Sequence, residues 1–140
     1  MVSSFLSKFS NFGLLLLRLT TGIAYVFVHG WPKISGGPEL WGGIGKALSN
    51  FGITFLPGAW GFLAAISEFG GGILLILGLF TRPAAAFMGF TMFVAATYHL
   101  TKLDPWNRVI YPVEMLGIFL CLIFVGAGKF SLDYLLFKKK

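Results

Sequence analysis

Long apolar stretches alternate with short polar breaks along the chain. Four of the stretches are long enough to cross the hydrocarbon core of a bilayer, which takes about 17 to 25 helical residues. They cover residues 12–28, 56–80, 84–100 and 110–127. The breaks carry turn-forming residues: Gly30-Trp31-Pro32, Thr81-Arg82-Pro83 and Asp104-Pro105-Trp106-Asn107. The pattern predicts an all-α, polytopic membrane protein, a four-transmembrane-helix bundle that forms a single domain over residues 1–140.

The connection between the first and second stretches contains a shorter helical pattern. Pro38 and Glu39 suit the first turn of a helix, and Gly52 suits its end. Apolar residues recur between them at helical spacing: Ile44, Leu48 and Phe51. We therefore expect a short interfacial helix between helices 1 and 2, with its apolar face on the membrane or capping the bundle.

Composition excludes a soluble single domain. Of the 140 residues 56% are hydrophobic and only 11% are charged, against about one quarter in globular proteins. The net charge of +6 comes half from Lys138, Lys139 and Lys140, which we interpret as a membrane-surface anchor. The expected partner of this chain is the lipid bilayer, and no nucleic acid is expected.

Basic residues predict the orientation in the membrane. One side carries six of them: Lys8, Arg82, Lys129, Lys138, Lys139 and Lys140. The other side carries four: Lys33, Lys46, Lys102 and Arg108. Because the cytoplasmic side of a membrane protein is richer in Lys and Arg, both termini are expected in the cytoplasm.

Three ionisable residues fall inside the predicted spans: Arg18, Glu68 and Glu114. An ionised group at mid-bilayer costs at least ~2.5 to 3.5 kcal/mol on insertion scales. Counted at about 1.5 Å per residue from His29 and from Leu56, Arg18 and Glu68 lie at similar depths. We therefore expect a structural ion pair between Arg18 and Glu68. The alternative is that Arg18 snorkels to the headgroups and that Glu68 is protonated.

A second group of polar and aromatic residues gathers toward the outer half of the bundle. Its imidazoles, phenols and carboxylate suit hydrogen bonding to quinone carbonyls and proton transfer at neutral pH. The expected catalytic or proton-handling residues are Glu114, His99 and His29. The expected cofactor-binding residues are Glu68, Trp31, Tyr98 and Tyr111. The alternative is that the aromatic residues form an interfacial belt and that the histidines touch headgroups.

Other chemistries find no support in the motifs. The sequence has no close-spaced ligand pair such as His-x-x-x-His, so no metal site is expected. Cys121 is the single cysteine and cannot form an internal dithiol. No P-loop, no dinucleotide-binding glycine motif and no Gly-x-Ser-x-Gly motif is present.

Several segments in their order along the chain resemble the DoxX family, including its DoxD-like members. They are Leu17-Arg18-Leu19 with Gly22, His29-Gly30-Trp31-Pro32-Lys33, Glu68 with Gly71 and Gly72, Leu77-Gly78-Leu79 with Thr81-Arg82-Pro83-Ala84, and Gly126-Ala127-Gly128 with Ser131-Leu132-Asp133. The resemblance implies a four-helix protein of the bacterial inner membrane. Some relatives are similar to subunits of a thiosulfate:quinone oxidoreductase, and a mycobacterial member is associated with a membrane oxidoreductase complex. The resemblance supplies no agreed catalytic residues.

The leading hypothesis is a small membrane subunit of a quinone-linked or redox-stress oxidoreductase system, with a quinone or a redox partner bound near the outer half. The cofactor is not identified by the sequence, and quinone is the candidate. Possible partners are subunits of a redox complex and further copies of this chain. A non-enzymatic scaffold or assembly protein with a structural polar core is the main alternative. A small carrier or proton path is a third hypothesis.

Overall fold

The computed structural model describes residues 2–137, with side chains from Phe9 onward, and in this range it consists of helices joined by short turns and irregular segments, with no strands. The elements are α1 (Val2–Ala24), the π-helical segment η1 (Tyr25–Gly30), α2 (Trp31–Ser35), α3 (Gly37–Gly45), the 3-10 helix η2 (Lys46–Phe51), α4 (Pro57–Leu77), α5 (Thr81–Thr101), α6 (Trp106–Val125) and α7 (Leu132–Phe137). The predicted all-α fold class is confirmed. The C-terminal lysines, residues 138–140, which we expect to anchor the tail, lie outside the described residues.

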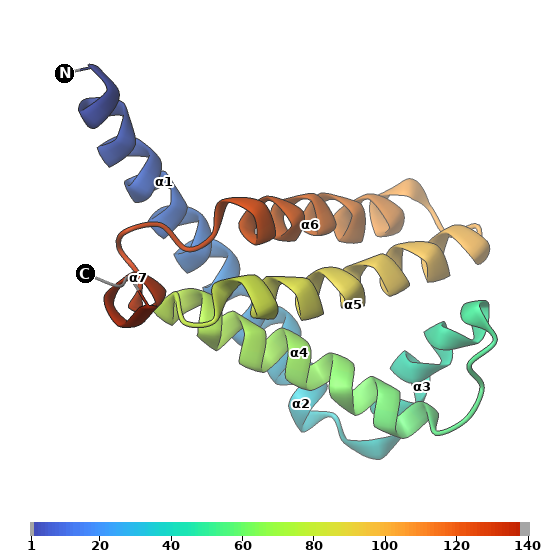
Figure 1. The fold of residues 1–140 in the computed structure, drawn as a ribbon. Helices are drawn as coiled ribbons and strands as arrows, with labels where there is room; N and C mark the ends of the chain where they lie inside the picture. The colour runs from blue at the N-terminus through green and yellow to red at the C-terminus, as the bar shows by residue number, and fades with distance from the viewer. Residues whose placement is uncertain (1, 138–140) are drawn as a thin grey trace.

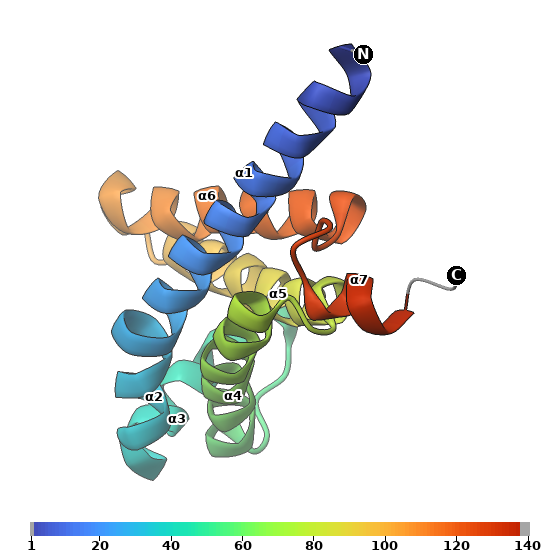
Figure 2. The ribbon, with the colours of Figure 1, turned by 90° about the vertical axis from the view of Figure 1, so that its left-hand side faces the viewer.

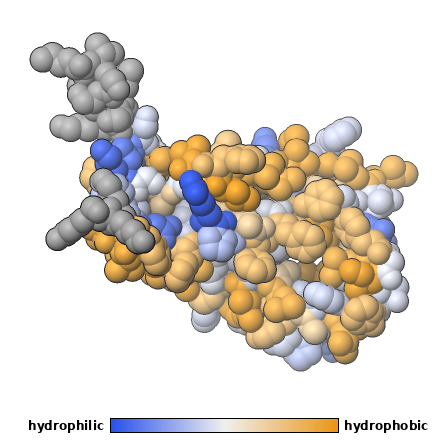
Figure 3. Space-filling model, viewed as in Figure 1, coloured by the Kyte–Doolittle hydropathy of each residue, from blue (hydrophilic) through white to orange (hydrophobic). Residues whose placement is uncertain are grey.

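Within the described part of the chain, four helices are long and apolar enough to cross a membrane: the continuous helix Phe9–Ser35, α4, α5 and α6. Figure 1 shows α5 between α6 and α4, and in Figure 2 α1 runs at a steep angle to α6. The face drawn in Figure 3 is mostly hydrophobic, which suits a surface surrounded by acyl chains. The chain is therefore a multi-pass membrane protein.

The first spanning helix does not end at Gly30-Trp31-Pro32, where the sequence pattern predicted a break. It passes through η1 and continues as α2 to Ser35. Pro32 lies in the first turn of α2, where a missing backbone N–H is tolerated. A π-helical turn accommodates an extra residue without ending the helix. The span is consequently about two turns longer at its C-terminal end than predicted.

The later helices begin closer to their breaks than the apolar pattern indicated. Thr81-Arg82-Pro83, predicted as a turn, is the first turn of α5, a position that tolerates proline. The turn between α4 and α5 instead uses Gly78 (φ 63°) and Phe80 (φ 48°) in the left-handed region. α6 likewise begins at Trp106, directly after Pro105, and not at residue 110.

The short helix expected between the first two spans is confirmed as α3, and it is extended by η2 to Phe51. Gly52, with φ 76°, follows the last residue of η2. α3 lies directly on the N-terminal half of α4, because a Cβ on Gly61 would lie only 1.8 Å from the Trp41 carbonyl oxygen. This glycine contact lets two backbones meet and fixes α3 against the bundle.

The hydrophobic core lies where η1, α4, α5 and α6 converge. Its buried members are Tyr25, Leu75, Ala85, Met88, Met92, Phe119 and Leu122. Gly71 admits the Met88 side chain, since a Cβ there would lie 2.5 Å from the Met88 sulfur. The core therefore packs the inner faces of the four spans together. It leaves one side of α4 and α5 unfilled, where a pocket lies.

Candidate functional site

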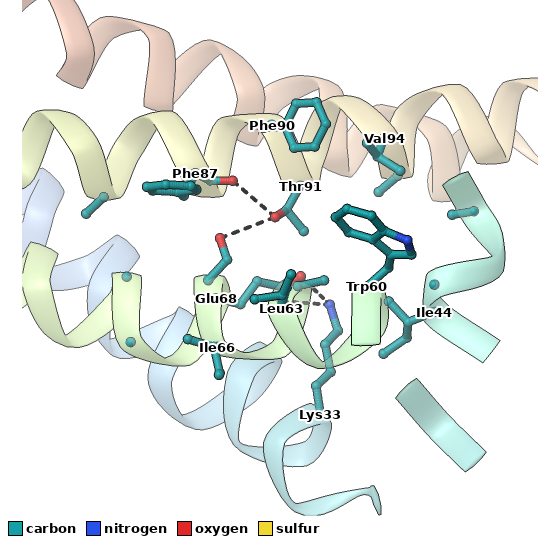
Figure 4. Close-up of a pocket in the computed structure, with 18 of the residues that line it drawn as sticks. Lys33, Ile44, Trp60, Leu63, Ile66, Glu68, Phe87, Phe90, Thr91 and Val94 are labelled. Carbon is teal, nitrogen blue, oxygen red and sulfur yellow. Dashed lines mark hydrogen bonds and ion pairs between the residues drawn. The ribbon is translucent and has the colours of Figure 1, made fainter. Parts of the chain in front are cut away.

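A pocket of about 660 Å³ lies between α4 and α5 and is bounded at one end by α3 and η2. This volume falls in the range of small-molecule sites in proteins. Figure 4 shows its mainly apolar walls, which include Leu63, Ile66, Phe87 and Phe90. The lining residues with polar side-chain atoms are Lys33, Trp60, Ser67, Glu68 and Thr91. An apolar site with a few polar groups suits a lipophilic ligand that carries a polar head.

An ion pair between Lys33 and Glu68 forms the charged part of the pocket wall. The Lys33 Nζ lies 2.6 Å from each carboxylate oxygen of Glu68. The Glu68 side chain is only 2% exposed, whereas that of Lys33 is 30% exposed. Continuation of the first span into α2 carries Lys33 to the level of Glu68 on α4. The pair neutralises a carboxylate that would otherwise be buried alone.

Two hydroxyl groups bridge α4 and α5 within the same pocket. The Thr91 and Ser67 hydroxyl oxygens lie 3.2 Å apart, within hydrogen-bond distance. The Thr91 hydroxyl also lies 3.1 Å from the Phe87 carbonyl oxygen, which accepts its hydrogen bond (Figure 4). The backbone carbonyl therefore already uses the Thr91 proton, and the Ser67 hydroxyl completes the bridge between the helices.

A phenol pair lies in the core near the ion pair. The Tyr111 hydroxyl donates to the Tyr25 hydroxyl at 3.1 Å, and the Tyr25 hydroxyl lies 3.2 Å from the Met92 sulfur. His29 stacks on Tyr111 with ring centroids 5.0 Å apart. Tyr25 and His29 both belong to the π-helical segment η1, a distortion often found at functional sites. Gly30, in the same segment, packs against the backbone of Phe69, the residue that follows Glu68.

The predicted ion pair between Arg18 and Glu68 is wrong. Glu68 pairs with Lys33, while the fully buried Arg18 donates to the Leu75 carbonyl at 3.3 Å and to the Phe130 carbonyl. The depth estimate placed the outer end of the first span at His29, but the helix continues to Ser35. Arg18 therefore lies at the C-terminal end of α4, where a cation satisfies free carbonyls and the helix dipole.

Asp133 completes this inner end, and sequence reasoning did not single it out as a functional group. Its two carboxylate oxygens accept hydrogen bonds from the backbone N–H groups of Phe80 at 2.7 Å and Thr81 at 2.9 Å. These N–H groups are at the start of α5, so Asp133 acts as a helix cap supplied from a distant segment. Arg18 and Asp133 thus tie the turn between α4 and α5 to α1 and α7.

The structure brings together only part of the predicted outer site. His29 and Tyr111 are in contact, and η1, which carries His29, packs against α4 at the residue that follows Glu68. His99 instead pairs with Asp104, its Nδ1 lying 2.7 Å from a carboxylate oxygen. Tyr98 packs on the His99 ring and so belongs to this second group. Trp31 is exposed beside Phe69, and Glu114 is exposed on α6. The catalytic and binding roles given to these residues stay predictions.

Sequence reasoning passed over Lys33, Trp60, Ser67 and Thr91 as site residues. One signal points to Lys33: it follows His29 by four residues, so the two side chains share one face if the helix continues. A helix that ends at Gly30-Trp31-Pro32, as the sequence pattern predicted, has no such shared face. Across residues 2–137, no three His, Cys, Asp or Glu side chains gather as a metal ion would require.

The sequence profile of the DoxX family matches residues 13–100. The chain belongs to the DoxX family. The matched region contains Lys33, Glu68 and every residue that lines the pocket. The site therefore lies within the part of the chain that defines the family.

Three relatives are similar to this DoxX-family chain over nearly their whole length. "Inner membrane protein YqjF" of Escherichia coli is 31% identical over 137 residues, which cover 96% of this chain and 99% of the relative. An "Uncharacterized protein" of Haemophilus influenzae is 33% identical, with 96% and 98% covered. "Putative oxidoreductase CatD" of Bacillus subtilis is 29% identical, with 96% and 95% covered. No solved structure gives a significant match.

Proposed function

We propose that this DoxX-family protein is a small integral membrane subunit of a quinone-linked oxidoreductase system and that the pocket between α4 and α5 holds the quinone. The observation that carries the proposal is an apolar cavity in the spanning region whose wall contains the Lys33–Glu68 ion pair. The relative named as an oxidoreductase, CatD, supports a redox role. We assign the protein to the bacterial inner membrane with both termini in the cytoplasm, and the E. coli relative supports that location.

The walls of the pocket favour a ligand that enters from the bilayer. Leu63 is 53% exposed, Phe87 68% and Phe90 60%, although all three lie inside spanning helices. Side chains exposed at that depth face acyl chains and not water. A lipid-soluble ligand can therefore reach the pocket sideways through the membrane.

The ion pair supplies a hydrogen-bond donor for one carbonyl oxygen of a quinone ring. A protonated Lys33 donates a charge-assisted hydrogen bond to a carbonyl oxygen, and Glu68 holds the ammonium group in place. When bound, a quinone supplies two-electron, two-proton chemistry. Glu68 is the carboxylate beside Lys33 that can hold or pass a proton, and the nearby phenols of Tyr25 and Tyr111 extend the polar region. The electrons are proposed to come from a partner redox protein.

Quinone binding by the purified full chain tests the proposal. The protein is reconstituted in lipid nanodiscs, bound quinone is extracted and identified, and the Kd of added duroquinone is measured. We expect wild-type binding and a loss of at least tenfold in Lys33→Met, because a charged hydrogen bond is removed. Lys129→Met, a change of exposed lysine at the inner end, is the matched control. Absence of wild-type binding, or equal binding by both variants, contradicts the proposal.

A scaffold or assembly role is the second candidate, and the inner end of the bundle favours it. The hydrogen bonds of Arg18 and Asp133 go to backbone groups and join α1, α4, α5 and α7. Such contacts specify packing without any chemistry. Crosslinking in native membranes separates the candidates: a scaffold retains its partner proteins in Lys33→Met and binds no quinone in either form.

A further inference from the structure

Trp60 presents a hydrogen-bond donor that no group of the described chain satisfies. Its indole Nε1 is buried and has no acceptor, yet the residue lines the pocket. The neighbouring indole of Trp41 shows the usual behaviour, since its Nε1 donates to the Lys33 carbonyl at 2.7 Å. Buried tryptophan N–H groups in proteins nearly always find a partner. The unpaired donor at Trp60 therefore needs its own explanation.

The surroundings of Trp60 offer no acceptor side chain. Figure 4 shows the indole between Ile44 and Val94, both apolar, and its ring packs edge-on against Phe55. The other buried atoms without partners, in Arg18 and Thr81, lie at the inner end of the bundle and outside the pocket. Trp60 is thus the one unsatisfied donor of this kind among the described residues that line the pocket.

Trp60 and Glu68 mark two polar points separated along α4. Their positions are eight residues apart, which corresponds to about 12 Å along the helix axis. A six-membered ring with carbonyl oxygens at both ends, plus a hydrogen bond of about 2.9 Å at each end, has a similar length. Figure 4 shows Lys33 reaching the pocket from a different side than Trp60.

We propose that Trp60 is a second ligand-binding residue of the pocket and donates its indole N–H to the ligand oxygen farthest from Lys33. This inference rests on the proposed function, because it takes the Lys33–Glu68 pair as the contact for the first oxygen. It narrows the ligand to a lipophilic ring with two opposed acceptors, a para-quinone. A fatty acid or another amphiphile with a single polar head satisfies one donor and leaves the other unpaired.

Trp60→Phe tests this assignment because it keeps an aromatic ring and removes only the N–H. The full chain in nanodiscs is titrated with duroquinone, which has two opposed carbonyls, and with oleate, which has one head. We expect duroquinone to bind about 3- to 10-fold more weakly in Trp60→Phe, as for one neutral hydrogen bond. Oleate binding should not change. Trp106→Phe, at the exposed start of α6, is the matched control.

Infrared difference spectra of bound duroquinone give a readout that is independent of affinity and folding yield. In the wild type we expect both carbonyl stretches below their values in alkane solvent, since both oxygens accept hydrogen bonds. One stretch should return to the solvent value in Trp60→Phe. Two shifted stretches in Trp60→Phe, or one unshifted stretch in the wild type, overturn the role of Trp60 and leave the proposed function standing. If wild-type protein binds no duroquinone, the proposed function fails first.

Discussion

Lys33 and Glu68 form an ion pair across two spanning helices, although the residues are 35 positions apart in the sequence. The pair joins the end of the first span to the middle of α4. Both residues line the apolar pocket, and the core residue Tyr25 belongs to η1, which leads into the helix that carries Lys33. This position gives the pair two roles, which are to hold the helices in register and to present charge to a ligand.

Breaking the ion pair from one side should destabilise the fold more than removing it altogether. Lys33→Met leaves the Glu68 carboxylate buried without a partner. Because Lys33 keeps 30% exposure, we expect a loss of about 2 kcal/mol or more, below the full penalty of a completely buried pair. The double variant Lys33→Met with Glu68→Leu should recover most of that loss. Unfolding in detergent measures the free energies, and strictly additive effects would refute the coupling.

The cap that Asp133 places on α5 should be measurable in stability. Asp133→Ala removes two acceptors from the N–H groups of Phe80 and Thr81, so we expect a loss of about 1 to 2 kcal/mol. Glu39→Ala, at an exposed position on α3, provides the comparison. Thermal unfolding midpoints of the two purified variants check the prediction. Equal midpoints would mean that the cap contributes nothing to the inner end.

The number of spans, the fold class and the short helix before α4 could be predicted from the sequence. Apolar stretches of sufficient length leave a chain in lipid few alternatives to a helix. The end of the first helix could not be predicted, because Gly30 and Pro32 are helix-ending residues in most settings. Only the π-helical turn and packing of Gly30 against the Phe69 backbone keep the helix continuous.

The wrong prediction for the end of the first spanning helix led to the wrong partner for Glu68. The predicted helix end excluded Lys33 from the first span and left Arg18 as the candidate partner of Glu68, whereas the helix continues to Ser35 and Lys33 makes the pair. Burial of Arg18 and Glu68 was predictable from the cost of charges in lipid. The contacts of Arg18 were not, because they involve carbonyl groups of Leu75 and Phe130, and any residue can supply a carbonyl. The pocket depends on tertiary packing and leaves no sequence pattern.

Two glycines on α4 should respond oppositely to alanine. A Cβ at Gly61 would lie 1.8 Å from the Trp41 carbonyl oxygen, a backbone atom that cannot move alone. We expect Gly61→Ala to cost about 1 to 3 kcal/mol by forcing α3 off α4. A Cβ at Gly70 meets nothing within 4 Å, so Gly70→Ala should be neutral or stabilise the helix by up to about 1 kcal/mol. Equal unfolding midpoints for the two variants would contradict the backbone contact between α3 and α4.

Glu114 and Glu68 are both carboxylates in spanning helices, yet their replacement should have opposite effects. Glu114 is exposed on α6 and makes no hydrogen bond or ion pair within the described residues, while Glu68 is buried and paired. Glu114→Leu removes an unpaired polar group from the lipid-facing surface, so we expect membrane insertion to improve and the unfolding midpoint to hold. Glu68→Leu alone leaves Lys33 unpaired and should lower the midpoint. Protease mapping of the inserted fraction, together with the midpoint of each purified variant, makes the comparison. If Glu114→Leu lowers the midpoint instead, another helix covers that face of α6 and supplies a partner for the carboxylate.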